Sequence, residues 1–232
     1  MGRHGGQSFD LYLHHNIRAT QRLFEAAKEL GGPRIVYASS SSVYGDTDQL
    51  PARETNRTRP RSPYGVTKLA CEHLADLYLA NFGVDAIGLR FFTVFGPRQR
   101  PDMAFTRFAR AVVLGEPITV FGDGEQSRDF TYVSDAVEAT YRAVTHGRGG
   151  AVYNVGGGER ASVNQVIAML EELSGGPIEV VRKERQAGDA RHTGADTSRA
   201  EADLGWRPTV GLREGLARQL EWARVAFAAA AR

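Results

Sequence analysis

The run Ile35-Val36-Tyr37-Ala38-Ser39-Ser40-Ser41-Ser42 decides the fold of this 232-residue chain. Its first four residues resemble the short, continuous apolar runs of strands that are buried in parallel sheets. The serines that follow place hydroxyl groups where such a strand would end. In open sheets with helices on both faces, ligands bind beyond the carboxyl ends of the strands. The run therefore predicts a buried strand that ends at a ligand site.

The segments on either side of this run extend the same pattern. From residue 9 to residue 30, apolar residues recur at helical spacing, and Gly31-Gly32-Pro33 then ends the pattern. A second helical pattern covers residues 65–82, and a second apolar, strand-like run follows at residues 86–91. The order helix, strand, helix, strand indicates right-handed crossovers between parallel strands. The remaining sequence has frequent turn signals, which favour a smaller lobe of mixed helices and strands.

Composition indicates a globular protein and points away from several classes of function. The 29 Lys and Arg residues nearly balance the 27 Asp and Glu residues and are scattered, so we expect no nucleic acid partner. No apolar run reaches the roughly 20 residues that cross a bilayer, and we expect no membrane association. The six histidines lack metal-ligand spacing, so no metal site is expected. Cys71 cannot form an internal disulfide and is expected to be a buried thiol, which fits a cytoplasmic protein.

The strongest local motif is Tyr64 with Lys68, because four residues along a helix bring two side chains to one face. A free tyrosine titrates near pH ~10, so a phenolate base that works near neutrality needs roughly 4 kcal/mol from nearby positive charge. Lys68 and an oxidised nicotinamide are expected to supply that charge. Alone, the motif also fits a solvated helix start. The upstream serine strand favours catalysis, because it brings a hydroxyl to the same sheet edge.

Four stretches resemble the successive signatures of extended short-chain dehydrogenase/reductases that act on sugar nucleotides. They are ASSSSVYG (38–45), SPYGVTK (62–68), RFFTVFGPRQRPDMA (90–104) and RDFTYVSDAV (128–137). The resemblance implies that Ser40 is the catalytic hydroxyl, Tyr64 the base and Lys68 its partner. Ser39, Ser41 and Ser42 are secondary candidates.

The resemblance also favours one reaction. Dehydratases of this family carry Asp and Glu directly after the catalytic hydroxyl, and the related decarboxylases keep the Glu, whereas this chain has Ser41 and Ser42. Epimerisation is left as the favoured chemistry. In it, the tyrosinate removes the C4 hydroxyl proton while hydride passes to NAD, and a transient 4-keto sugar forms. A dehydratase or decarboxylase is the weaker alternative.

The stretch around residues 90–104 is more similar to UDP-glucuronate 4-epimerases than to glucose-specific enzymes, where Asn commonly stands at the position of Thr93. A C6 carboxylate needs a cationic partner, and Arg100 is the first candidate because a guanidinium binds a carboxylate with two hydrogen bonds. Arg98 is the second candidate, and Ser41 and Ser42 are expected to assist. Each arginine also fits a solvated loop charge.

The remaining site residues follow from the resemblance. Arg128 matches a phosphate-binding arginine of the family, and Asp189 and Arg191 lie in a run that resembles the second uridine-diphosphate contact, which Arg185 is expected to join. NAD is the expected cofactor, with contacts from Asn16, Ser39, Tyr64 and Lys68. The expected partner is a UDP-sugar, with a homodimer left open as the assembly.

The resemblance implies an α/β fold with an incomplete Rossmann-like, doubly wound parallel sheet and a smaller α+β substrate-binding lobe. Residues 1–97 are expected to be the C-terminal part of the dinucleotide-binding domain, without the first strands and the glycine-rich loop that bind the cofactor's pyrophosphate. Residues 98–232 are the expected substrate lobe, with about 132–156 returning to the first domain. A truncated, non-catalytic fragment that at most binds UDP-sugars is therefore the second hypothesis.

Overall fold

The computed structural model describes residues 7–184 and 191–228. The helices of these residues are α1 (Gln7–Tyr12), the π-helix η1 (Leu13–Arg18), α2 (Ala19–Glu29), the short 3-10 helix η2 (Ser41–Val43), α3 (Pro63–Phe82), α4 (Ala104–Leu114), α5 (Val133–His146), α6 (Val163–Ser174), α7 (Ser198–Leu204) and α8 (Leu212–Ala226). The strands are β1 (Ile35–Ser40), β2 (Ala86–Phe91), β3 (Thr93–Phe95), β4 (Ile118–Phe121), β5 (Ser127–Tyr132), β6 (Val152–Val155), β7 (Glu159–Ser162) and β8 (Val180–Lys183).

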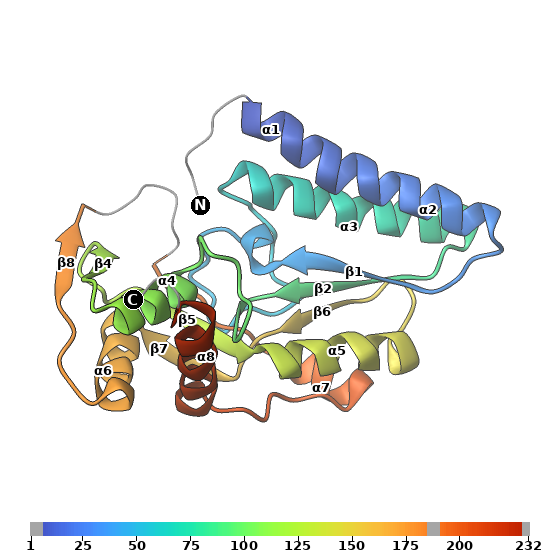
Figure 1. The fold of residues 1–232 in the computed structure, drawn as a ribbon. Helices are drawn as coiled ribbons and strands as arrows, with labels where there is room; N and C mark the ends of the chain where they lie inside the picture. The colour runs from blue at the N-terminus through green and yellow to red at the C-terminus, as the bar shows by residue number, and fades with distance from the viewer. Residues whose placement is uncertain (1–6, 185–190, 229–232) are drawn as a thin grey trace.

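The larger part of the molecule is built around a parallel sheet with the order β1-β2-β6. Helices α2 and α3 cover one face of this sheet, and α5 and α7 cover the other (Figure 1). Apolar side chains pack on both faces: Phe24 and Tyr37 lie on the α2–α3 side, while Leu89 and Tyr153 lie on the α5–α7 side. The expected α/β fold with a parallel, doubly covered sheet is therefore confirmed.

Strand β1 lies at an edge of this sheet, because within the described residues it pairs with β2 alone. Ala38, in the middle of the strand, is exposed to solvent. Parallel strands direct alternate main-chain groups to opposite neighbours. The outer side of β1 therefore carries main-chain groups that β2 does not satisfy.

The helical pattern expected over residues 9–30 is present, but it contains a π-helical turn. The chain is helical from Gln7 to Glu29, and its second turn, η1, has the wider π geometry. Such turns are rare and often lie at functional sites. Here the turn carries Asn16, whose amide donates a hydrogen bond of 2.9 Å to the hydroxyl of Thr67 in α3. The side-chain bond ties this helix to the helix that carries Tyr64.

Helix α3 begins two residues earlier than the sequence pattern indicates. The hydroxyl of Ser62 accepts a hydrogen bond from the Gly65 amide, and Pro63 occupies the first turn, where its missing N–H is not needed. The helix ends at Gly83, which has a left-handed backbone with φ of 67°. The cap at Ser62 therefore places Tyr64 in the first helical turn, next to the serines that follow β1.

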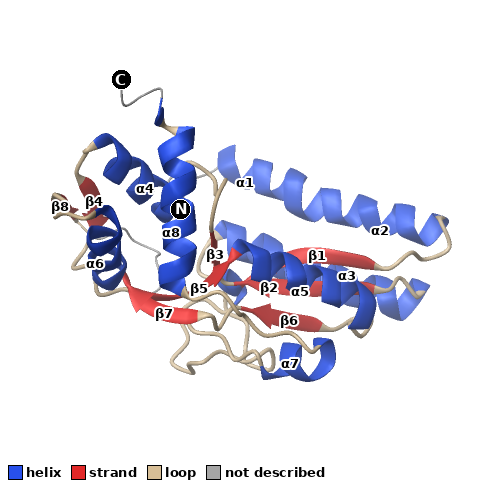
Figure 2. Ribbon diagram, turned by 60° about the horizontal axis from the view of Figure 1, so that its bottom comes forward, coloured by secondary structure: helices blue, strands red, loops and turns tan. Residues whose placement is uncertain are grey.

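The smaller lobe holds the sheet β3-β5-β7 and the strand pair β4-β8, with α4, α6 and α8 packed around them (Figure 2). Its core is rich in aromatic rings, among which Phe105 and Phe130 lie with centroids 4.5 Å apart. The segment from α5 to β6 returns to the larger part: α5 packs on the first sheet, and β6 pairs with β2. No helix of the described residues is long and apolar enough to cross a bilayer.

Candidate active site

Ser40 is the last residue of β1, and its hydroxyl helps to form the turn that follows. Its Oγ accepts a hydrogen bond of 3.1 Å from the Ser42 amide and lies 3.1 Å from the Ser42 hydroxyl, to which it donates. The Ser40 side chain thus caps the short helix η2. Ser41 and Ser42 lie in η2 and are partly buried. The strand end therefore holds a compact group of hydroxyls at the sheet edge.

Tyr64 and Lys68 lie on one face of α3, as their spacing predicts. The Lys68 Nζ atom is 5.6 Å from the centroid of the Tyr64 ring. The same ammonium donates a hydrogen bond of 2.8 Å to the main-chain oxygen of Ala38, on the exposed edge of β1. Lys68 therefore joins the tyrosine to the strand that carries Ser40.

Several neighbouring groups act on the pKa of the Tyr64 phenol. Burial is the largest influence and raises the pKa of the Tyr64 phenol above its ordinary value. The Ser40 hydroxyl, through a hydrogen bond, and the positive charge of Arg100 oppose this rise, whereas Tyr12 and Cys71 add to it. Burial also lowers the pKa of Lys68. The Lys68 ammonium bonds the Ala38 carbonyl, and the expectation that Lys68 and an oxidised nicotinamide together lower the pKa of Tyr64 stays a prediction.

Two residues expected to contact the cofactor have their side chains bonded within the protein. The Asn16 amide bonds Thr67, and the Ser39 hydroxyl donates to the Glu72 carboxylate. Ser39 is 2% exposed and therefore faces the interior between β1 and α3. Sequence reasoning did not single out Glu72, although it lies eight residues after Tyr64 on the same helix. A spacing of two helical turns was the available signal.

The loop after β3 carries the arginines expected at the sugar. Arg98 is exposed and has a positive φ of 65°, which is uncommon for a residue other than glycine. Arg100 is also exposed and forms a two-bond ion pair with Asp102 at 3.0 and 2.9 Å. Thr93 lies at the start of β3 and is partly buried. Arg100 is the arginine of this loop whose charge acts on Tyr64.

A buried glutamine holds this loop in place, and sequence reasoning missed it. The side-chain oxygen of Gln219, in α8, accepts a hydrogen bond of 3.0 Å from the Gly96 amide. The Gln219 side-chain nitrogen lies 3.4 Å from the side-chain oxygen of Gln99, which also accepts from the Thr106 amide. Gln219 is only 1% exposed. The contact spans more than 100 residues of chain, so no local pattern could indicate it.

The arginines expected at the diphosphate lie together in the smaller lobe. The Arg128 guanidinium donates to the main-chain oxygens of Ser127 and Arg191, at 2.9 and 3.1 Å. The Arg191 guanidinium contacts Asp123 at 3.2 Å and is exposed. The Arg128 side chain thus contacts the main chain of Arg191, which lies far from it in the sequence. Arg185 and Asp189, the other expected contacts, lie outside the described residues.

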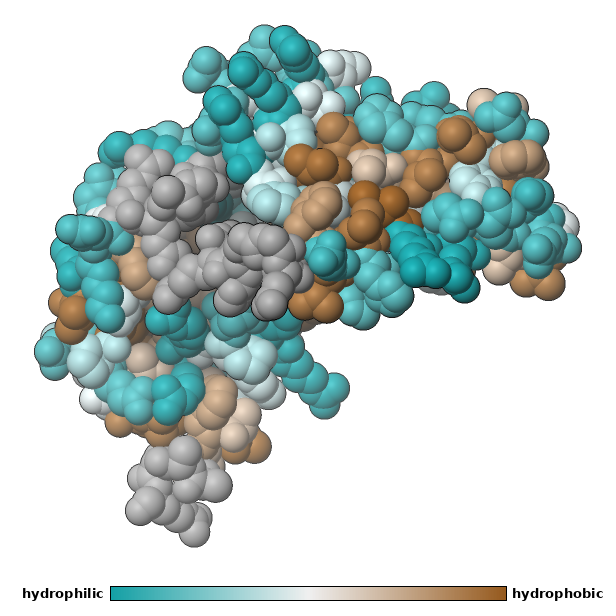
Figure 3. Space-filling view, turned by 90° about the horizontal axis from the view of Figure 1, so that it is seen from above, coloured by the Kyte–Doolittle hydropathy of each residue, from teal (hydrophilic) through white to brown (hydrophobic). Residues whose placement is uncertain are grey.

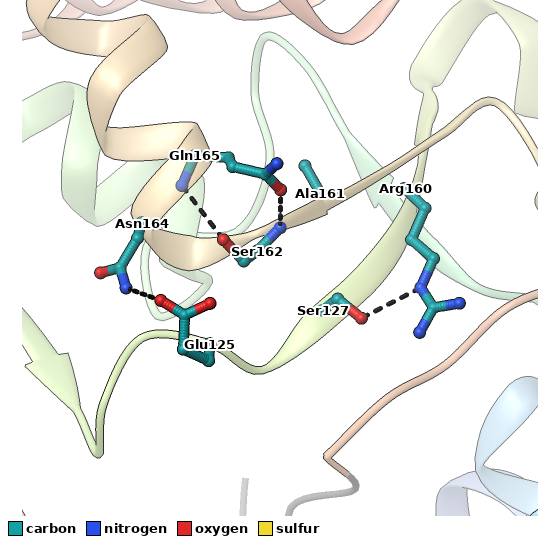
Figure 4. A pocket seen from close by; sticks show the side chains of 7 residues that line it. All are labelled: Glu125, Ser127, Arg160, Ala161, Ser162, Asn164 and Gln165. Carbon is teal, nitrogen blue, oxygen red and sulfur yellow. Dashed lines mark hydrogen bonds between the residues drawn. The ribbon is translucent and has the colours of Figure 1, made fainter.

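A separate open pocket of about 420 Å³ lies at the first turn of α6 (Figure 4). It is lined by Glu125, Ser127, Arg160, Ala161, Ser162, Asn164 and Gln165. Its polar groups largely bond one another, as Arg160 does with Ser127 at 3.0 Å. None of the residues expected from the sequence lines it, so we assign it no ligand. Within the described part of the chain, no cluster of three or more metal-binding side chains occurs.

Comparison with known proteins places this arrangement among nucleotide-sugar enzymes. Residues 4–156 match the family model described as the NAD dependent epimerase/dehydratase family. The chain is 44% identical to the uncharacterized UDP-glucose epimerase YtcB of Bacillus subtilis, over 94% of this chain and 69% of that protein. It is 36% identical to the UDP-glucuronate 4-epimerase of Thermodesulfobacterium geofontis, over 92% of this chain and 66% of that protein.

A solved structure agrees with these relatives. The crystal structure of UDP-glucuronic acid 4-epimerase from Bacillus cereus, in complex with UDP-glucuronic acid and NAD, superimposes with a TM-score of 0.92 and 41% identity. The match covers 96% of this chain and 71% of that chain. This chain thus spans about two thirds of the length of each of these three proteins.

Proposed function

This chain belongs to the NAD dependent epimerase/dehydratase family, and from this premise we propose that it is a UDP-glucuronate 4-epimerase. The single observation that carries the proposal is the convergence of Ser40, Tyr64 and Arg100. The Ser40 hydroxyl and the Arg100 charge both lower the pKa of the Tyr64 phenol. A hydroxyl and a phenol are the groups that would bind and deprotonate a sugar hydroxyl. A guanidinium is the group that would bind a nearby carboxylate.

The residues present fit the nicotinamide end of NAD. An ammonium has three donors, and the hydrogen bond of Lys68 to Ala38 uses one of them, at an edge of β1 that is open to solvent. Tyr64 lies beside that ammonium. Lys68 and Tyr64 would therefore hold this end of the cofactor. Asn16 and Ser39 would help to hold α3, which carries Tyr64 and Lys68, through their hydrogen bonds to Thr67 and Glu72.

Bound NAD would take up hydride from C4 of the sugar and return it to the other face. The protein's part is to move one proton. Tyr64, as phenolate, removes the proton of the C4 hydroxyl, and the carbonyl of the 4-keto sugar forms. Ser40 holds the same oxygen through its hydroxyl. When the hydride returns, Tyr64 gives the proton back, and the epimer is released.

The two arginine groups would bind the rest of the substrate. Arg128 and Arg191 lie together and match the charge of a diphosphate. Arg100 can accept a C6 carboxylate if it exchanges its ion pair with Asp102, which is a modest cost because both side chains are 64% exposed. Ser41 and Ser42 offer further hydroxyls. Their identity argues against dehydration, because it places no carboxylate directly after Ser40.

Incubating the chain with UDP-glucuronate and NAD tests the proposal, with UDP-galacturonate as the expected product. The Tyr64→Phe variant is the control for a contaminating enzyme. If UDP-glucose is epimerised and UDP-glucuronate is not, the substrate assignment is wrong. If neither reacts while calorimetry shows UDP-sugar binding, the non-catalytic hypothesis is correct. A product that has lost water or carbon dioxide indicates a lyase.

We also propose that the protein is a homodimer. Apolar side chains are exposed along α1, α2 and α3, among them Leu11, Leu23, Leu30, Leu77 and Phe82. Figure 3 shows apolar surface over these helices. An extended apolar face of this kind is typical of a subunit interface. Leu77→Lys should yield monomers in sedimentation, whereas Val225→Lys, at an exposed position of α8, should not. A parent protein that sediments as a monomer excludes the dimer.

The location of the protein is inferred from its single cysteine. The buried Cys71, which forms no disulfide, favours a reducing, cytoplasmic location.

A further inference from the structure

A buried polar network lies directly behind Ser40. The Glu72 carboxylate, from α3, forms two hydrogen bonds with the Arg90 guanidinium of β2, at 2.9 and 2.7 Å. The same carboxylate accepts the Ser39 hydroxyl of β1. Arg90 also donates to the Tyr44 hydroxyl at 2.8 Å, which in turn donates to the Asn154 side chain of β6 at 2.7 Å. The network thus connects α3 with the ends of all three strands of the first sheet.

Stability alone is a weak reason for such a network. Glu72 and Arg90 are each 5% exposed, so both charged groups are almost fully shielded from solvent. Removing two ions from water costs several kcal/mol each, and apolar residues of similar volume often stabilise a core equally well or better. A satisfied polar network does specify one arrangement of its members, because each donor has a fixed acceptor. A role in arrangement therefore explains this network better than a role in stability.

The members of the network adjoin the proposed catalytic groups. Ser39 precedes Ser40 in β1, and successive side chains of a strand point to opposite sides. Fixing Ser39 on Glu72 therefore fixes the direction of Ser40. Glu72 also lies on α3, two turns after Tyr64 and one after Lys68. We propose that Glu72 is a positioning residue, which holds Ser39 through its hydroxyl and so keeps Ser40 aimed at Tyr64, with Arg90 holding the Glu72 carboxylate in place.

The expected effect of Glu72 on kcat rests on the proposed function, whereas its expected effect on the pKa of Tyr64 does not. A misplacement of about 1 Å can slow an enzyme by up to about 100-fold without weakening substrate binding. Ser40 also lowers the pKa of the Tyr64 phenol, so that a displaced Ser40 should let this pKa rise. The second effect can be measured in a protein that turns over no substrate. The carbon-13 resonance of the Tyr64 ring carbon that bears the hydroxyl reports it, and Tyr64→Phe identifies the resonance.

Ser39→Ala is the first variant, because it removes a single hydroxyl and no charge. Its kcat should fall about 10-fold while KM stays unchanged, and the pKa of Tyr64 should rise. Ser162→Ala is the matched control, because Ser162 is also a buried serine, and its hydroxyl accepts a hydrogen bond from the Gln165 amide at the start of α6 in the smaller lobe. It should lower stability without changing kcat or the Tyr64 titration. A Ser39→Ala protein with the parent's Tyr64 titration overturns the proposal.

The double variant Glu72→Leu, Arg90→Met separates positioning from stability. It replaces the ion pair with apolar side chains, so the protein should melt at or above the parent's temperature. Its kcat should nevertheless stay about 10-fold below that of the parent, and its Tyr64 pKa should be raised. Recovery of the parent's kcat and Tyr64 titration together with stability shows a purely structural role and overturns the proposal. If the parent epimerises no UDP-sugar, the proposed function fails, and the Tyr64 titration still decides this inference.

Discussion

Gly65, at the start of α3, lies against the main-chain oxygen of Ser42. A Cβ atom added to Gly65 would stand 2.6 Å from that oxygen, which is closer than real Cβ contacts. The helix that carries Tyr64 and the turn that follows Ser40 are therefore in direct main-chain contact. Glycine at this position allows the proposed base and the proposed catalytic hydroxyl to approach each other.

Gly65→Ala should lower kcat at least about 10-fold, because the added methyl group must push α3 away from the serine turn. In a helix, alanine is ordinarily more stable than glycine by about 1 kcal/mol, so propensity alone predicts an improved protein. Steady-state kinetics and thermal melting of the variant check both effects. Gly176→Ala is the control, because its added Cβ would meet no atom within 4 Å. Parent-like kcat in Gly65→Ala would show that the contact is not needed.

Tyr64→Phe should abolish turnover and leave UDP-sugar binding largely intact. The substitution removes the phenol oxygen that takes the proton, whereas the ring, which contacts Tyr12 at a centroid distance of 5.8 Å, remains. Product formation and calorimetric binding of UDP-glucuronate are the two measurements. Turnover close to that of the parent would refute the assignment of the base. Ser40→Ala should be slower but not necessarily inactive, because the Ser42 hydroxyl lies 3.1 Å from that of Ser40.

Arg100→Ala should raise KM for UDP-glucuronate by about 10-fold or more and change KM for UDP-glucose little. The reason is that only the glucuronate sugar presents a carboxylate, and a hydrogen-bonded charge pair is worth about 1.5–3 kcal/mol. Arg110→Ala is the control, because Arg110 is an exposed arginine of α4 that pairs with Glu116, just after the helix. Equal losses for both substrates would mean that Arg100 serves the nucleotide or the fold.

The pH dependence of Arg100→Ala should also differ from that of the parent. The base is active as phenolate, so kcat rises as pH increases through the pKa of Tyr64. The Arg100 charge lowers that pKa, so its removal should raise the pKa and move the inflection of kcat to higher pH. A pH profile at saturating substrate measures the shift, and Arg110→Ala should leave it in place. An unmoved inflection in Arg100→Ala would show that its charge does not reach Tyr64.

Gln219→Met should weaken the hold of α8 on the loop that carries Arg98 and Arg100. The variant keeps the side-chain length but leaves the Gly96 amide without its acceptor, which should cost about 1–3 kcal/mol of unfolding free energy. KM for UDP-glucuronate should rise as the loop loses its support. Denaturant unfolding and kinetics measure the two effects, with exposed Glu221→Gln as the control on the same helix. Unchanged KM with lowered stability would confine Gln219 to a structural role.

The parts of the site that depend on local spacing could be predicted from the sequence. Tyr64 and Lys68 share a helix face because they are four residues apart, and the strand at Ile35 ends in serines because the pattern of apolar residues stops there. Cys71 is buried, as its helical neighbours indicated. Arg128 and Arg191 could be paired only through the family resemblance, because 63 residues separate them.

The parts that depend on tertiary contacts could not be predicted in this way. Lys68 bonds the main-chain carbonyl of Ala38 in β1, a contact that no pattern within α3 reveals. The pKa of Tyr64 depends on how deeply α3 packs, because burial is the largest influence on it. The π-helical turn at residues 13–18 is also invisible in the spacing of apolar residues, since a single wider turn shifts their periodicity only slightly.

The left-handed backbone of Arg98 has a consequence for efforts to make this protein more heat-resistant. A non-glycine residue with positive φ costs on the order of 1 kcal/mol relative to glycine, and engineers commonly recover such energy by substitution. Glycine at position 98 would relieve the backbone but remove a guanidinium from the loop that is proposed to meet the substrate. Selection for thermal stability alone would thus favour variants with glycine at position 98. A library of variants of this protein should therefore be screened for activity as well as for stability.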